Sequence, residues 1–165
     1  MTAQALDRPV PTNPIARLAG MIPYNAAMVV SILARLTGAA AAVYYAYDQD
    51  VLFPDRHFPR TWLIALVIAV TALISLVPFA RLGLKPGLAA WLGALGCGLL
   101  VFGGAMLSHK APGLVVVAAG VIAWVSYAAV SYQRGDGPGP SVSGLMSGSL
   151  LAYITVGIAV FLVGA

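Results

Sequence analysis

The chain alternates between long apolar stretches and short polar segments that contain Pro and Gly. Five of the apolar stretches are long enough to cross the hydrocarbon core of a bilayer, for which an α-helix needs about 20 residues. They cover residues 25–47, 61–80, 87–108, 113–132 and 144–163. Because the segments between them are short, consecutive helices should be antiparallel neighbours. The pattern predicts an all-α integral membrane protein, a bundle of about five transmembrane helices with short loops.

Residues 1–23 differ from the rest of the chain. They contain four prolines and three charged residues, a composition too polar and too interrupted for a span. A secretory signal would show its apolar core soon after a charged start, whereas here the first apolar stretch begins late and is split by Arg35. We expect residues 1–23 to be an uncleaved, Pro-rich cytoplasmic tail and residues 24–165 to form a single transmembrane helical domain.

The composition agrees with a membrane environment, because 61% of the residues are hydrophobic and only 8% are charged. A soluble chain of this size would lack the polar side chains needed to cover its own surface. The formal charge of +4 comes from basic residues scattered through the tail and the loops. That distribution suits anionic lipid headgroups better than nucleic acid, which calls for a clustered basic face. We expect membrane lipids as partners and no nucleic acid.

The basic residues of the polar segments predict the orientation in the membrane. Five fall on the side of the N-terminal tail and three on the opposite side: Arg8, Arg17, Arg81, Lys85 and Arg134 against Arg56, Arg60 and Lys110. Cytoplasmic loops carry an excess of Lys and Arg. We therefore expect a multi-pass protein of the cell inner membrane, with its N-terminus cytoplasmic and its C-terminus periplasmic.

Arg35 is the one charged residue inside an apolar stretch, near the middle of residues 25–47. A charge at membrane depth costs roughly 2.5 to 3.5 kcal/mol on insertion scales, so it usually marks a pathway, a ligand or a partner. On a helical wheel Arg35 shares a face with Ser31, Gly38 and other small residues, which allow another helix to approach closely. Arg35 should therefore face protein and not lipid.

The sequence offers neutral partners for Arg35 at about the same depth, because no Asp or Glu occurs in the other four stretches. They are Thr71, Cys97, Tyr153 and Thr155, in addition to Ser31 on the same helix face. Two interpretations stay open. In one, Arg35 is a polar pin that uses such groups and water to fix helix register. In the other, it binds an anion: an acidic residue of another subunit, a phosphate or carboxylate of a lipid or cofactor, or a translocated solute.

Small residues predict where the helices pack. The predicted helix-packing residues are Gly38 on the Arg35 face, Gly93, Gly96 and Gly104 in the third stretch, and the GxxxG pair Gly144 and Gly148 in the fifth. Close backbone packing through such faces is the main route to helix association in lipid. They can serve packing within the chain alone, but two Gly-rich helices in a five-helix chain leave a face for a partner.

Other chemistry is only weakly indicated. Three carboxylates and two imidazoles are expected on the outer side of the membrane and could bind Mn, Zn or Cu: Asp48, Asp50, Asp55, His57 and His109. Their spacing matches no known ligand pattern, and charged interfacial loops are the commoner explanation. The apolar stretches also lack a nucleophile with a nearby base. We therefore do not expect an enzyme, and the sequence specifies no cofactor.

Together these features favour a non-catalytic polytopic subunit of a larger inner-membrane complex, with an accessory, assembly or structural role. It would pack against other integral membrane subunits through small-residue helix faces, with Arg35 pairing to an anion of a partner, lipid or cofactor. The alternative is a small oligomeric transporter or channel in which Arg35 lines an anion pathway. An enzyme acting on a lipid headgroup or a quinone ranks third, because Arg35 lies too deep for a headgroup.

Overall fold

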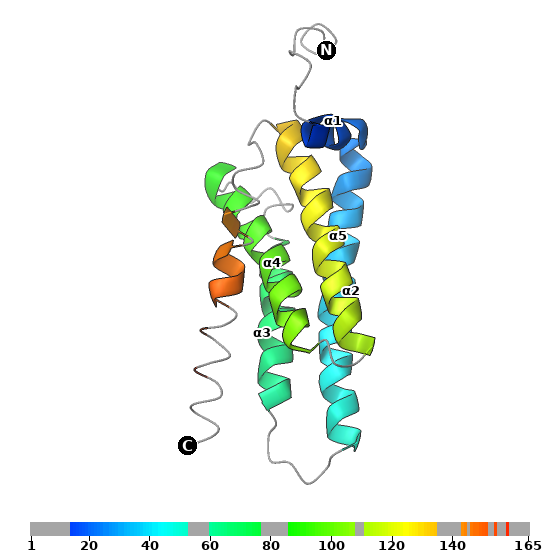
Figure 1. Cartoon of the computed structure of the whole chain (residues 1–165), viewed down its shortest axis with the longest axis vertical. Coiled ribbons are helices and arrows are strands. Elements are labelled where there is room, and N and C mark those ends of the chain that lie inside the picture. The colour runs from blue at the N-terminus through cyan, green and yellow to red at the C-terminus, as the bar shows by residue number, and fades with distance from the viewer. Residues whose placement is uncertain are drawn as a thin grey trace, which may run out of the picture.

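A computed structural model of the chain describes residues 14–52, 60–76, 86–107, 111–134, 143–144, 146–151, 154 and 158. Within these residues the secondary structure is helical, which confirms the all-α prediction for this part of the chain. The helices are α1 (Pro14–Met21), α2 (Tyr24–Leu52), α3 (Arg60–Ile74), α4 (Pro86–Met106) and α5 (Ala111–Arg134). Helices α2 to α5 run along the length of the bundle, and α1 lies across one end of it (Figure 1).

Three of the described helices are long and apolar enough to cross a membrane. They cover Tyr24–Asp48, Leu88–Ala105 and Ala111–Gln133, close to the predicted stretches 25–47, 87–108 and 113–132. The prediction of about five spans is therefore supported in part, since membrane insertion itself requires an experiment.

The other two predicted stretches are only partly described. In the stretch 61–80, the apolar part of α3 is shorter, Trp62–Ile74, and a turn follows at Ser75 and Leu76. Pro78 lacks the amide hydrogen that a continuing helix would donate to Ile74. In the stretch 144–163, residues 144, 146–151, 154 and 158 are helical, and the others lie outside the described residues.

Consecutive helices of the bundle are neighbours: α2 contacts α3, α3 contacts α4 and α4 contacts α5, while α2 and α5 also pack together. The interior of the bundle is built mainly from alanine, with Ala42, Ala65, Ala72 and Ala94 all fully buried. Many large apolar side chains are exposed on the outside of the bundle, among them Leu33, Leu66 and Val125. This inverted pattern is typical of helices that associate in lipid, where small residues let backbones approach and lipid is as apolar as leucine.

Helix α1 was not foreseen in the residues 1–23 assigned to a tail. It ends before Pro23, and the carbonyl of Pro23 accepts the amide of Ala27 at 2.9 Å as α2 begins. Ile22 and Tyr24 pack beside this bend against Ala27 and two small residues of α5. With eight residues, α1 is far too short to cross a bilayer, so no span is found in the described part of the tail.

Candidate functional site

Arg35 lies at the centre of the bundle. Its side chain is fully buried, and it is the largest fully buried side chain among the described residues. Within the candidate span Tyr24–Asp48 it lies roughly 17 Å and 20 Å from the two ends, at 1.5 Å per helical residue. The expectation that Arg35 faces protein and not the surface therefore agrees with its position.

Two helices supply the first acceptors for the guanidinium group. On α2, Nη1 of Arg35 donates to the carbonyl of Ser31 at 2.9 Å and also to the Ser31 hydroxyl. The two residues are four positions apart, so they share one face of the helix. At the end of α3, Nε donates to Oγ of Ser75, the first residue of the turn after Ile74, at 2.8 Å. The Ser75 hydroxyl in turn donates to the carbonyl of Ala72 at 2.6 Å, which fixes the direction of its lone pairs.

Helix α4 binds the remaining nitrogen of the guanidinium. Nη2 donates to the carbonyl of Gly93 at 2.7 Å and to Sγ of Cys97 at 3.0 Å. The Cys97 thiol donates to the same Gly93 carbonyl at 3.2 Å, so Gly93 and Cys97 form one acceptor pair a helical turn apart. An arginine has five N–H bonds, and the contacts to α2, α3 and α4 offer five acceptors for them.

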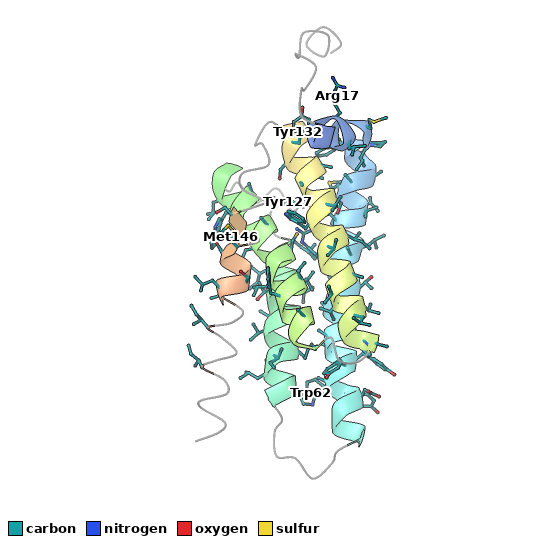
Figure 2. The ribbon with its side chains drawn as sticks, in the orientation of Figure 1. Arg17, Trp62, Tyr127, Tyr132 and Met146 are labelled. Carbon is teal, nitrogen blue, oxygen red and sulfur yellow. The ribbon has the colours of Figure 1, made fainter. Side chains whose placement is uncertain are left out.

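Tyr127 of α5 contributes its aromatic ring. The central carbon of the Arg35 guanidinium lies 5.2 Å from the ring centroid, within the range of a cation–π interaction. The Tyr127 hydroxyl donates to the carbonyls of Ala89 and Ala90 on α4, at 3.2 and 3.1 Å. Figure 2 shows Tyr127 in the interior, between α4 and α5. Among the described residues, Arg35 is thus contacted from its own helix, from the turn at the end of α3, from α4 and from α5.

Two glycines of α4 make room for this site. A methyl group added at Gly93 would collide with the ring and hydroxyl of Tyr127, and one added at Gly96 would collide with Cβ and Oγ of Ser75. The absence of side chains at these positions lets Tyr127 and Ser75 reach Arg35 across α4. The Gly-rich sequence of α4 is therefore a condition for the hydrogen bonds of the arginine, not only for close helix packing.

The electrostatics of the site are those of a buried cation held by dipoles. The acceptors from Ser31, Ser75, Gly93 and Cys97 are neutral, so they stabilise the charge without cancelling it. Burying an ion costs several kcal/mol even after relaxation, and hydrogen bonds to a charged group return about 1.5–3 kcal/mol each. Several such bonds together are of the size needed to hold Arg35 in the interior.

The predicted site residues divide into three groups. Ser31 and Cys97 contact Arg35. Thr71 lies one turn before Ser75 on α3, where its backbone carbonyl accepts the Ser75 amide at 2.9 Å. Tyr153 and Thr155 lie outside the described residues. Three further partners were not named from the sequence: Ser75, the Gly93 carbonyl and Tyr127, although backbone carbonyls near glycines were expected among the acceptors. The helical repeat could have identified Ser75, because it follows Thr71 by one turn and therefore shares its helix face.

All six predicted packing glycines lie at helix contacts within the chain. Besides Gly93 and Gly96, a methyl group at Gly38 would lie 2.7 Å from a Leu100 methyl, and one at Gly104 would lie 2.8 Å from the Val117 amide nitrogen. Gly148 packs on the backbone of Gly98, 2.9 Å from an added methyl, and Gly144 packs on Ala94. At these six positions the small faces are covered by the chain itself, so they offer no open face for a partner.

The weak metal prediction stays untested, because most of its residues lie outside the described part of the chain. Asp48 is half-buried at the end of the α2 span, and only the backbone of Asp50 is described. Asp55, His57 and His109 lie outside the described residues. Within the described part of the chain, no group of three His, Cys, Asp or Glu residues could hold a metal ion.

Two buried polar atoms of α5 stand apart from the Arg35 site. Within the described residues, Nε1 of Trp124 and Oγ of Ser131 have no hydrogen-bond partner. A buried polar group usually finds a partner in the protein or in an ordered water. Among the described residues, these two atoms therefore lack the partner that a buried polar group usually finds.

The fold and the site together define a helical bundle with three candidate membrane-crossing helices and a fully buried arginine at its centre. Comparison of the chain with protein-family models, curated protein sequences and solved structures gave no match in any of the three.

Proposed function

We propose that this protein is a non-catalytic polytopic subunit of a larger inner-membrane complex, in which Arg35 acts as an internal pin that sets the arrangement of its helices. The observation that carries the proposal is the closure of the Arg35 site. The guanidinium is fully buried and its acceptors come from α2, α4 and the turn at the end of α3, with the Tyr127 ring of α5 beside it. Such an arrangement suits a scaffold better than a binding pocket.

The packing of α4 supports the same role. At Gly93, Gly96 and Gly104 the neighbouring atoms leave no room for even a methyl group. Interiors packed this closely transmit strain and do not deform continuously. A gating movement of α4 against α3 and α5 would break both these contacts and the hydrogen bonds of Arg35 to α4. A rigid packing subunit needs no such movement.

A partner subunit would meet the outer surface of the bundle, since the glycine faces are covered. Leu33 on α2, Leu66 on α3 and Val125 on α5 are each more than half exposed. An anion from a partner, lipid or cofactor would have to displace one of the neutral acceptors in order to pair with Arg35. For the orientation, we place the end of the bundle that carries α1 in the cytoplasm, on the basic-residue bias of the sequence.

Tryptophan substitution on the outer surface tests the subunit proposal. Leu33→Trp, Leu66→Trp and Val125→Trp each add bulk outside the bundle, so lipid should accommodate them without loss of folding. Each variant is tagged, expressed at its natural level, extracted gently and examined by native gel and mass spectrometry. We expect stoichiometric foreign polypeptides with the native chain and their loss with at least one variant. A lone homo-oligomer from native membranes would refute the proposal.

The alternative is a small oligomeric transporter or channel with Arg35 beside an anion pathway. The observation that favours it is the pair of polar atoms on α5, Trp124 Nε1 and Ser131 Oγ, which could contact water or solute in the interior. Anion flux into liposomes distinguishes the two functions. Flux that is lost in Arg35→Met but kept in Leu36→Met, an exposed neighbour on the same helix, would favour transport. Absence of anion flux with the native protein would exclude the transporter or channel.

A further inference from the structure

Helix α1 (Pro14–Met21) is held in a fixed position across one end of the bundle (Figure 1). The side-chain amide of Gln133, near the end of α5, donates to the carbonyl of Ile22 just after α1. A methyl group added at Gly20 would lie 3.9 Å from the ring of Tyr132, an ordinary contact, so α1 rests on the last turn of α5. The crosswise direction of α1 is thus part of the fold.

The outer face of α1 is both basic and apolar. Arg17 is exposed, and Figure 2 shows it pointing away from the bundle. Leu18 and Met21 are 65% and 78% exposed, the latter the most exposed large apolar residue of the described chain. Positions 17, 18 and 21 share one side of a helix. A helix with this pattern is typical of segments that lie in the plane of a membrane interface.

The position of α1 agrees with such a placement. The candidate span of α2 begins at Tyr24, three residues after α1 ends, so α1 lies where a bilayer enclosing that span would have its headgroups. The basic residues near α1 also agree with a position at anionic headgroups. Arg134 ends α5 there, and Arg8 precedes α1 in the sequence. Basic residues near a membrane surface are attracted to anionic lipids by about 1 kcal/mol each.

We propose that α1 lies in the membrane interface and binds the phosphate groups of anionic phospholipids through Arg17, while Leu18 and Met21 enter the boundary between headgroups and acyl chains. The proposal shares with the proposed function only the placement of the bundle in a membrane. It needs no partner subunit, so its test is independent of the test for a complex.

The first measurement is lipid binding by the purified full-length chain. Native mass spectrometry compares retention of phosphatidylglycerol by the wild type, Arg17→Gln and Arg17→Lys, the matched control that keeps the positive charge. We expect Arg17→Gln to retain phosphatidylglycerol about fivefold more weakly, the factor that corresponds to about 1 kcal/mol. Arg17→Lys should bind much as the wild type does, because the attraction comes from the charge. Equal loss in both variants, or no loss in either, would overturn the proposal.

The second measurement does not depend on Arg17. Met21→Cys in a Cys97→Ser background carries the only thiol of the chain and accepts a nitroxide spin label. In nanodiscs of phosphatidylcholine and phosphatidylglycerol, collision with oxygen, which concentrates in lipid, should exceed collision with a water-soluble nickel complex. Greater access to nickel would place α1 in water. Access to neither reagent would mean that protein covers the face, and either result would overturn the proposal.

Discussion

Gly96→Ala is the sharpest test of how the Arg35 site is built. The added methyl would lie under 3.0 Å from both Cβ and Oγ of Ser75. Carbon atoms make contact at about 3.5 Å, so α3 would have to retreat by more than roughly 0.5 Å. Rotation of the Ser75 side chain gives no relief, because its Cβ is itself one of the two colliding atoms. The backbone of α3 must move.

The expected loss has two parts. Overpacking of a filled interior costs about 1–3 kcal/mol. Retreat of Ser75 also lengthens its 2.8 Å hydrogen bond to Nε of Arg35, and loss of a bond to a charged group costs about 1.5–3 kcal/mol. Alanine returns about 1 kcal/mol through its higher helix propensity. We expect Gly96→Ala to lower the free energy of unfolding by about 3 kcal/mol, measured by reversible unfolding in sodium dodecyl sulfate followed by tryptophan fluorescence.

Two further variants make the result decisive. In Gly20→Ala the added methyl meets only the Tyr132 ring at 3.9 Å, so stability should change by less than about 1 kcal/mol. In the double variant Ser75→Gly/Gly96→Ala the colliding atoms are gone, and the combined loss should be at least about 1 kcal/mol smaller than the sum of the single losses. Strict additivity, or a Gly96→Ala variant as stable as the wild type, would refute the argument that Gly96 makes room for Ser75.

Three more outcomes follow from the same contacts. Ser75→Ala should lower the free energy of unfolding by about 1.5–3 kcal/mol, because it removes an acceptor of the guanidinium. Ser131→Ala should be neutral or stabilising, because the Ser131 hydroxyl has no partner within the described residues. Unfolding of both variants in the same assay checks this. Tyr127→Phe should lose about 0.5–1.5 kcal/mol, since the ring stays and only the hydroxyl bonds to α4 go. Gln133→Ala should release the Ile22 carbonyl, and hydrogen exchange of α1 should then rise while that of α4 stays unchanged.

The length of the continuous apolar stretches was enough to predict the long helices. Stretches 25–47, 87–108 and 113–132 correspond to helices long enough to cross a membrane, and the burial of Arg35 was predicted from the small residues on its helix face. The helices depend on local sequence alone. The burial of Arg35 also needs the other helices, but the small residues one helical turn away already mark the face that they cover.

The partners of Arg35 were harder to predict because they depend on how helices are staggered. Depth counting selected Thr71, but α3 presents Ser75, one turn further along, because Gly96 of α4 is the position that admits a side chain from α3. The Gly93 carbonyl could not be found from side-chain chemistry, since any residue has a backbone carbonyl. Helix α1 was missed because four prolines in residues 1–23 outweighed an eight-residue helical pattern.

The arginine at the centre of an alanine-rich bundle can fix the register in which neighbouring helices pack. Replacing Arg35 by an apolar residue would leave few orphaned groups, since the Ser75 hydroxyl keeps the Ala72 carbonyl and the Gly93 carbonyl keeps the Cys97 thiol. Buried charges in such settings often add little net stability. Small side chains, however, offer few distinctive shapes to align neighbouring helices. A planar group with five donors, matched to acceptors on three helices, is satisfied in one alignment only, and every helical turn of slippage would leave a buried charge with fewer bonds.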